Sequence, residues 1–409
     1  MSIIETLQGR GVVFPDPGAV YVAPEVDPMR ILPGAVLHPS SRITGKRTLI
    51  MEGAEIGSEG PAVVNDCAVG PGARLKGGSF SGAVFLSGAS VGPAAHVRPG
   101  TIFEEGTSAA HAAGVKQTIL FPWATLGSLV NFCDCLMSGG TGPKNHSEVG
   151  SSYIHFNFTP QQDKATASLI GDVPRGVMLR ENPIFLGGQG GLAGPCNIAY
   201  GSVIAAGTVW RRDIIEEDRL WVTGPLSRSA GLKFTPGLYK SIAGIVEHNL
   251  GYLGNLVALF NWYVHVRSLF FATEPEKALH AALVETCREA VTERLKQMAL
   301  LASLMPRSIA LYRAAEGNPP EHLLSQKQEL FDKWPIVEEG TRARLDETAD
   351  QPPEAFLEAV AGAKEASSGD YLKAVLLLDD KDRTAGTAWL DGIVAEVMAM
   401  GREVLSSFA

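Results

Sequence analysis

Three histidines that could carry a proton during catalysis lie between residues 111 and 155. They are His111, His146 and His155. The pKa of an imidazole is ordinarily near neutral, so such a side chain can take a proton from a reacting group and later release it. The alternative for each of the three is a structural or solvated histidine. The sequence therefore offers several general bases, and the choice among them depends on the elements that position them.

Cys133 and Cys135 are separated by one residue and look like a fragment of a metal site. A zinc site normally needs four ligands with a recognisable second pair. The remaining cysteines, Cys67, Cys196 and Cys287, lie far from this pair in the sequence. An odd total of five also argues against a framework of disulfides. We therefore expect no metal, and the alternation is more typical of a strand.

The middle of the chain repeats with a period of six residues. Aliphatic or aromatic residues recur at this spacing, and small residues such as glycine and alanine precede many of them. The runs are Phe85, Val91, Val97, Phe103, Ala109, Val115 and Phe121; Ile31, Leu37, Ile43 and Leu49; and Val63, Val69 and Leu75. Neither an α-helix nor a simple hairpin has this period, whereas a fixed short period marks a solenoid.

We interpret each six-residue unit as one short strand and one corner of a triangular β-coil. The aliphatic residue points inward, and glycine supplies corner angles that other residues adopt only at a cost. Three units make one coil of about 18 residues, which pairs its backbone with the coils above and below. Repeats of this kind turn left-handed, against the usual right-handed crossover rule. The predicted fold is a left-handed parallel β-helix, and the alternative is a set of loops in a β-sandwich.

Glycine marks the extent of this coil. The chain has 409 residues and 45 glycines, about 11% against a typical ~7%. Residues 31–210 contain 29 of the 45, and the six-residue period falls in the same segment. The phase slips at 139–143, 161–164 and 173–183. We expect loops there, which in solenoids often project on the binding face.

Charge and hydropathy exclude several functions. A net charge of −9 argues against nucleic-acid binding, which normally needs a basic stripe. The N-terminal residues include Glu5 and no long apolar run, so we expect no signal peptide. The most apolar stretch, 250–271, is interrupted by four polar residues that a membrane span would tolerate poorly. We expect a soluble, cytoplasmic protein without nucleic-acid or membrane partners.

The pattern becomes helical from Pro236 onward. The segment KALHAALVETCREAVTERLKQMALLASLM places apolar residues at i, i+3, i+4 and i+7, the spacing of an amphipathic helix. Prolines divide the remainder into about six helices. We predict two domains, a β-coil at 1–235 and an all-α module at 236–409. No catalytic motif is visible in the second.

Several segments of the coil resemble one known family. They are GVVFPDPGAVYVAPEVDPMRILPGAVLHPSSRITG at 11–45, HVRPGTIFEEG at 96–106, NFTPQQDKATASLIGD at 157–172 and VIAAGTV at 203–209. These segments are similar to the acetyltransferase half of the bacterial bifunctional enzymes that acetylate glucosamine 1-phosphate and then uridylate it. The resemblance covers roughly residues 11–230. It places the chain among the hexapeptide-repeat acyltransferases.

The resemblance implies a binding site for a sugar phosphate. In the family, an arginine in an RPG turn and a lysine about one coil later hold the phosphate, and they correspond to Arg98 and Lys116. Their separation of one coil stacks the two cations about 5 Å apart, where an arginine fork and a lysine point charge suit a phosphate dianion. Asn157 and Lys164 correspond to residues that contact the sugar. The alternative is four ordinary surface side chains.

The family's catalytic histidine, which removes a proton from the acceptor amine, is missing. Alignment through LGSLVNF places Ser128 at its position, and serine has no useful basicity near neutral pH without a partner. The other departures are Asn131 and Phe158 in place of tyrosines, Glu148 in place of an asparagine and Gly188 in place of a serine. Among the histidines, we select His155, two residues before Asn157, as the candidate base.

The resemblance also implies acetyl-CoA or another acyl-CoA as co-substrate, and a homotrimer whose sites lie between subunits. Gly188, Ala206 and Arg228 correspond to positions near the acyl donor. The glycine-rich loop of the family's nucleotidyltransferase domain is absent, so we expect no uridylyltransferase or pyrophosphorylase activity. Two functions stay open. One is an acyltransferase with a remodelled base, acting on a phosphorylated or nucleotide-linked amino sugar, and the other is a non-catalytic sugar-phosphate-binding or scaffold protein.

Overall fold

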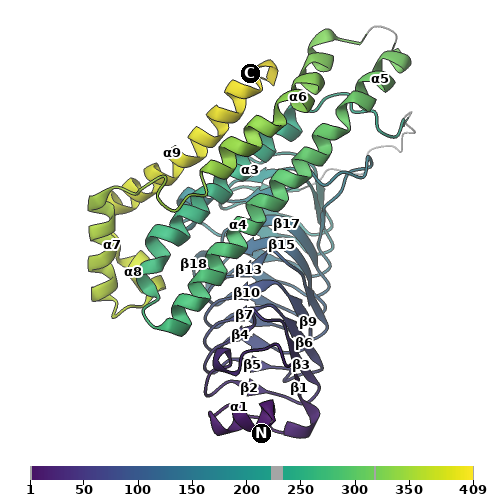
Figure 1. The fold of residues 1–409 in the computed structure, drawn as a ribbon. Helices are drawn as coiled ribbons and strands as arrows, with labels where there is room; N and C mark the ends of the chain where they lie inside the picture. The colour runs from purple at the N-terminus through teal and green to yellow at the C-terminus, as the bar shows by residue number, and fades with distance from the viewer. Residues whose placement is uncertain (1, 223–233, 317–318, 409) are drawn as a thin grey trace.

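A long parallel β-coil rises from the N-terminus, and a group of helices crosses its upper half (Figure 1). The computed structural model describes residues 2–222, 234–316 and 319–408. Helix α1 (Ile3–Gly9) closes the lower end of the coil, where Leu7 is buried in the coil interior. A cap of this kind covers apolar surface that a further coil would otherwise cover.

Three faces of short strands form the coil, and each strand pairs in parallel with its equivalents in the coils before and after. The first face contains β1 (Tyr21–Val22), β3 (Ser41–Thr44), β6 (Ala62–Asn65), β9 (Gly78–Ser81), β12 (Ala95–Val97), β21 (Ile154–Phe156), β24 (Gly191–Ala193) and β27 (Val209–Trp210). The second contains β4 (Leu49–Ile50), β7 (Ala68–Val69), β10 (Ala83–Phe85), β13 (Thr101–Phe103), β22 (Ser168–Ile170) and β25 (Asn197–Ile198). The longer strands β15 (Gly114–Leu120) and β17 (Asn131–Met137) bend round the corner and belong to both.

The third face is a separate ladder of ten strands in the described residues. It contains β2 (Val36–Leu37), β5 (Glu55–Ile56), β8 (Arg74–Leu75), β11 (Ser90–Val91), β14 (Ser108–Ala109), β16 (Thr125–Leu126), β20 (Glu148–Val149), β23 (Phe185–Leu186), β26 (Val203–Ile204) and β28 (Leu220–Trp221). The prediction of a parallel β-coil followed by helices is therefore confirmed.

Most residues of the six-residue period point into the coil, but three do not. Val63 lies on the outer surface, while Leu49 and Phe121 pack beneath the helices. The interior places are taken by their neighbours Ile50, Val64 and Leu120. Each exception follows a corner that is longer or shorter than the repeat allows. Because side chains alternate between the two sides of a strand, a shift of one residue reverses their direction.

Helices account for most of the chain after residue 242. They are α3 (Ala243–Asn261), the π-helical turn η3 (Trp262–Val266), the 3-10 turn η4 (Arg267–Phe270), α4 (Glu274–Ser303), α5 (Met305–Glu316), α6 (Glu321–Ala343), α7 (Glu354–Ala366), α8 (Tyr371–Leu377) and α9 (Asp380–Val404). Helix α4 begins with a capping box between Thr273 and Glu276 and has Pro275 in its first turn, the arrangement that favours helix initiation. Pro335, one of the prolines expected to divide this segment into helices, lies inside α6.

The helices and the second face of the coil share one apolar core. Helix α4 packs against β7, β10 and β13, and α3 packs against α4 and α9. A single cluster of buried residues joins Leu86, Ile102 and Leu136 of the coil to Leu253 and Leu283 of the helices. The division into domains at residue 235 stays a prediction. What the structure adds is that the helices cover the coil rather than standing apart from it.

Two of the three expected loops contain regular structure. Residues 139–146 include an antiparallel hairpin of β18 (Gly140–Gly142) and β19 (Asn145–His146). The expected loop at 173–183 includes the short helix α2 (Val173–Gly176), which is capped by Asp172. None of the helices in the described parts of the chain has the length and apolar character needed to cross a membrane.

Candidate functional site

One corner of the coil aligns the predicted base position with two of the predicted acyl-donor residues. We call this column the serine corner; from bottom to top it consists of His111, Ser128, Ser151, Gly188 and Ala206. Backbone N–H groups of the following residues connect the coils: Leu129 donates to His111, Ser152 to Ser128, Gln189 to Ser151 and Gly207 to Gly188, at 2.8–3.0 Å. The five residues therefore occupy the same position in five successive coils, about 4.8 Å apart.

Glycines beside the serine corner allow neighbouring coils to approach closely. A Cβ atom on Gly150 would lie 2.3 Å from the backbone nitrogen of Gly188, and one on Gly187 would lie 2.3 Å from that of Ala206. No real side chain tolerates such contacts with backbone. The corner is consequently narrow and rigid.

The substitution Gly150→Ala tests this close packing. We expect it to lower the free energy of unfolding by about 1–3 kcal/mol, because the added methyl group must push two coils apart. Gly60→Ala is the control, since a Cβ there meets no atom within 4 Å. Urea denaturation measures both. Equal stability of the two variants would contradict the tight corner.

Some backbone donors of the serine corner are free. Within the described residues, the N–H groups of Ser151, Gly188 and Ala206 have no hydrogen-bond partner, although their neighbours are bonded between coils. Ser151 and Ala206 are exposed and Gly188 is half-buried. Unpaired backbone N–H groups near the surface can donate to an oxygen of a ligand. The column thus offers one free donor per coil above Ser128.

Ser128 has a histidine partner that sequence reasoning did not assign to it. Its Oγ lies 3.0 Å from Nδ1 of His111, one coil below. Its backbone N–H donates to Ser151 Oγ at 3.2 Å, which fixes the corner from above. His111 is exposed and Ser128 is half-buried, so a ligand in solution can reach the pair. His111 and Ser128 are 17 residues apart, about one coil, and this spacing was the only sign of the pair in the sequence. Many pairs without a function have the same spacing.

Arg98 and Lys116 lie in neighbouring coils at the corner between the first and second faces. The backbone N–H of Arg98 donates to the carbonyl of Val115 at 2.9 Å, and Lys116 is in register with Cys133 in the next coil. The Arg98 guanidinium reaches past Lys116, and its Nη2 donates to Cys133 Sγ at 3.2 Å. Its Nε is buried without a partner among the described residues. Their assignment to a phosphate stays a prediction.

Asp134 and Arg294 form a buried ion pair beside these cations, and the sequence did not reveal it. Asp134 Oδ1 lies 2.9 Å from Nη2 of Arg294, which comes from α4. Nη1 of Arg294 donates to the Lys164 carbonyl at 2.7 Å and lies 3.3 Å from Asn249 Oδ1. Asn157 lies close enough to Asp134 to lower the pKa of its carboxyl. Predicted residues 157 and 164 therefore meet at this pair, where α4 passes the upper coils (Figure 1).

The electrostatics of this cluster favour an anion. Burial raises the pKa of Asp134, while Arg294, Asn157, Lys116 and Lys164 act in the opposite direction. We call Arg98, Lys116, Lys164 and Arg294 the cation cluster; against its four positive charges stands the carboxylate of Asp134. Such an excess of positive charge attracts phosphate groups.

His155, the histidine selected from the sequence, points into the coil. Its side chain is 1% exposed, its Nε2 lies 2.9 Å from Ser168 Oγ, and its ring packs edge-on against Phe132. Burial lowers its pKa to about 4, so the ring is uncharged at neutral pH. A ring enclosed in this way reaches no substrate on the surface, and the geometry argues against His155 as the base.

The remaining candidates have other surroundings. His146 lies in the β18–β19 hairpin, where its Nδ1 bonds the carbonyl of Pro143 at 2.9 Å. Cys133 and Cys135 are buried free thiols, and no metal-binding group of three or more His, Cys, Asp or Glu side chains occurs in the described residues. Arg228 lies outside the described residues.

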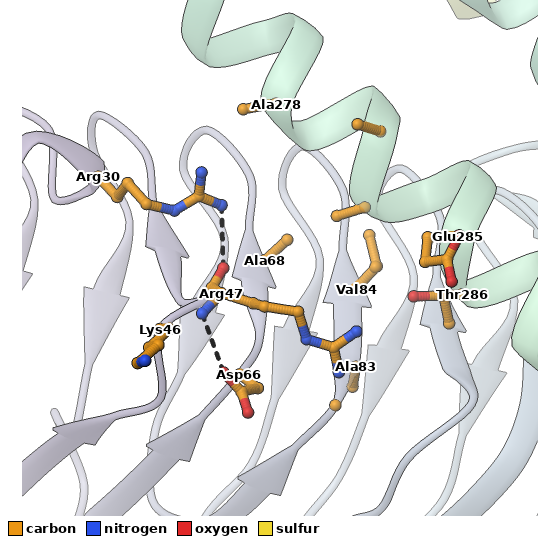
Figure 2. A pocket seen from close by; sticks show the side chains of 13 residues that line it. Arg30, Lys46, Arg47, Asp66, Ala68, Ala83, Val84, Ala278, Glu285 and Thr286 are labelled. Carbon is orange, nitrogen blue, oxygen red and sulfur yellow. Dashed lines mark hydrogen bonds between the residues drawn. The ribbon is translucent and has the colours of Figure 1, made fainter. Parts of the chain in front are cut away.

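A separate cleft lies between the lower coils and α4 (Figure 2). It measures about 450 Å³, and alanine side chains from both sides form much of its wall. Arg47 donates its backbone N–H to Asp66 and its guanidinium to Glu289, while Arg30 donates to the carbonyls of Arg47 and Thr48. Arg30, Arg47 and Asp66 of this cleft thus already have hydrogen-bond partners.

No family model matches the chain, but sequence relatives do. "Bifunctional protein GlmU" of Thermotoga petrophila is 27% identical over 214 residues, which are 52% of this chain and 43% of that protein. The protein of the same name from Nocardia farcinica is 29% identical over 212 residues, 52% of this chain and 38% of its own length. The chain therefore spans about two fifths of the curated relatives that it matches.

Solved structures give only weak similarity. An Arabidopsis UDP-N-acetylglucosamine acyltransferase covers 50% of this chain and 67% of its own, with 12% identity and a TM-score of 0.19. A perosamine N-acetyltransferase from Caulobacter crescentus, in complex with CoA and GDP-perosamine, covers 37% of this chain and 64% of its own, with 18% identity and a TM-score of 0.11. Scores this low leave the identification to the sequence relatives. The six-residue repeat, the parallel β-coil and the similarity to GlmU proteins across about half of the chain fit a hexapeptide-repeat acyltransferase domain.

Proposed function

We propose that the protein transfers an acyl group, in particular acetyl from acetyl-CoA, to an amino sugar that carries a phosphate or a nucleotide. The observation that carries the proposal is the pairing of two corners on the same coils. The serine corner presents free backbone donors and a histidine–serine pair. Across the first face, the cation cluster presents the side chains of Arg98, Lys116 and Lys164, with the buried Arg294 behind them. The serine corner therefore suits an acyl thioester, and the cation cluster suits an anionic acceptor.

In this proposal the acyl donor lies along the serine corner. The free N–H groups of Gly188 and Ala206 bind amide carbonyls of the pantetheine arm, as the family resemblance suggests for these positions. The thioester then lies near Ser128. His111 replaces His155 as the proposed base, because it is exposed and lies beside the position of the family's catalytic histidine.

The acceptor's phosphate is proposed to bind at the cation cluster. Arg98 has an unpartnered Nε, and no hydrogen bond or ion pair holds the Lys116 amine among the described residues. Asn157 and Lys164 remain proposed sugar contacts, positioned by Asp134 and Arg294. In this scheme a helix of the same chain completes the acceptor site.

The distance between the serine corner and the cation cluster limits which acceptors fit the proposed site. Ser128 and Cys133 are five residues apart across the first face, which corresponds to about 17 Å for an extended strand. The amine and phosphate of a hexosamine monophosphate are much closer together. Within one chain, a nucleotide-linked amino sugar therefore fits better. A hexosamine phosphate would need the second corner from a neighbouring copy, which the predicted homotrimer would provide.

The test measures CoA release and acetylated product with purified protein, acetyl-CoA and two acceptors, a hexosamine 1-phosphate and a nucleotide-linked amino sugar. We expect turnover with the nucleotide-linked acceptor. Lys116→Met should raise its KM about tenfold or more, since a charged hydrogen bond is lost. Lys46→Met is the matched control, because Lys46 is an exposed cation at the same corner several coils lower. Sedimentation establishes whether a trimer forms.

The second candidate is a non-catalytic sugar-phosphate-binding or scaffold protein. Ser128 in place of the family's histidine favours it, as does the buried Asp134–Arg294 pair, which already neutralises part of the cation cluster. Acceptor binding by calorimetry without any acetyl transfer would support this candidate and contradict the enzyme.

A further inference from the structure

We infer that Ser128 is a nucleophile and that acyl transfer passes through an acyl-serine on this residue, with His111 as its base. The inference rests on the proposed acyltransferase function and adds a covalent step to it. A covalent intermediate divides one difficult transfer into two easier ones. Its required signature is a nucleophile and a base within hydrogen-bond reach of each other, which the pair at 3.0 Å provides.

The surroundings of Ser128 support a reactive hydroxyl. Within the described residues, the imidazole Nδ1 of His111 is the hydrogen-bond partner of the hydroxyl. With Nδ1 unprotonated, the ring accepts the hydroxyl proton and increases the nucleophilicity of Oγ. The bond between the Ser128 backbone N–H and Ser151 Oγ holds the residue in place. Ser128 cannot act as a base alone, but with His111 beside it the hydroxyl is placed to attack an acyl thioester.

The neighbouring coil provides a group for the developing negative charge. The free backbone N–H of Ser151 lies one coil above Ser128, on the side where the acyl donor is proposed to lie. A preorganised N–H donor can stabilise the oxyanion of a tetrahedral intermediate. The coils above contribute Gly188 and Ala206, whose small side chains do not cover Oγ.

The chemical steps balance without any further reagent. Ser128 Oγ attacks the carbonyl carbon of the acyl thioester, and its proton passes to His111 Nδ1. The C–S bond breaks, its electron pair stays on sulfur, and the thiolate takes the proton from the imidazolium to leave as the CoA thiol. The acceptor amine then attacks the ester carbon and loses a proton to His111. The C–O bond breaks, and Oγ takes that proton back as the amide forms.

The experiment mixes the full chain with acetyl-CoA in the absence of acceptor and stops the reaction with acid at short times. We expect a burst of CoA thiol approaching one equivalent per chain, and an acetyl group on the peptide that contains Ser128. Ser128→Ala should remove both and lower turnover about 10³-fold or more. Ser128→Cys should restore an adduct as a thioester, and His111→Asn should suppress the burst.

A matched control and two contrary results make the inference testable. Ser58→Ala, at an exposed serine away from the serine corner, should leave the burst and the adduct unchanged. Transfer to the acceptor at the normal rate by Ser128→Ala, or without any adduct in the parent protein, would overturn the acyl-serine and leave the acyltransferase intact. Absence of both adduct and transfer would overturn the proposed function, and the nucleophile with it.

Discussion

Replacing Arg294 with methionine should lower the free energy of unfolding by about 3–5 kcal/mol, because it leaves a carboxylate buried without its partner. Arg294 is 3% exposed and Asp134 is 7% exposed at the side chain. The guanidinium also donates to the carbonyl of Lys164, so the variant leaves a second buried acceptor unpaired. Chemical denaturation followed by circular dichroism measures the loss.

Companion variants distinguish the stability lost to the unpaired charge from the stability lost to poorer packing. The double variant Asp134→Asn with Arg294→Met should recover much of the stability, since neither charge then remains buried. Arg288→Met is the control on the same helix, where the surface ion pairs with Glu285 and Glu347 contribute at most about 1 kcal/mol. A loss at Arg294 no larger than at Arg288 would contradict the buried pair.

The same pair connects the helices to the candidate acceptor site. Asp134 lies at a corner of the coil in a left-handed conformation, with φ of 58°, and Arg294 reaches it from α4. In the proposed acceptor site, this contact orders Asn157 and the backbone at Lys164. In that proposal the helical part of the chain therefore helps to order the acceptor site, although no catalytic motif is visible in its sequence.

The period of six was enough to predict the coil but not the direction of every side chain. Val97, Phe103 and Val115 point inward as expected. Phe121 does not, because the coil interior passes from Val115 to Leu120, one residue early. Corner length is set by local backbone geometry, such as the left-handed Gln117 at φ 49°, and composition alone does not reveal it.

From the sequence, the candidate site could be predicted only where its residues are separated by whole coils. A spacing of one coil places Arg98 directly below Lys116 and is visible in the sequence. Arg294 is separated from Asp134 by 160 residues, and nothing in a single sequence couples two such distant positions. His155 shows a different limit: in β21 it lies between two exposed residues, Ile154 and Phe156. Its apolar neighbours gave no hint that the histidine, rather than they, faces inward.

A second buried charge cluster joins the coil to the helices near Glu104. The hydroxyl of Tyr263 donates to Glu104 Oε1 at 2.5 Å. Next to it, Arg267 pairs with Glu105, and its guanidinium lies 3.7 Å from the centroid of the Tyr371 ring. Burial raises the pKa of Glu104 to about 7, the Glu105 charge acts in the same direction, and Arg267 and the Tyr263 hydroxyl act against them.

This raised pKa predicts a pH dependence of stability with a defined sign. In the unfolded chain the carboxyl ionises near its ordinary pKa of 4.5, so between about pH 4.5 and 7 the folded protein binds more protons than the unfolded one. The contribution of Glu104 is therefore fully present below pH 4.5 and is lost as the pH rises through 7. A shift of this size corresponds to about 3 kcal/mol.

The measurement is the difference in free energy of unfolding between the parent protein and Glu104→Gln, taken from pH 4.5 to pH 8. The glutamine stays neutral throughout, so the parent should lose about 3 kcal/mol relative to it over this range. Tyr263→Phe removes a donor to the ionised carboxylate and should move the midpoint upward. A difference that is flat with pH, or that grows in favour of the parent as the pH rises, would show that Glu104 is ionised in the folded core. Arg267 would then have to compensate both carboxylates at once.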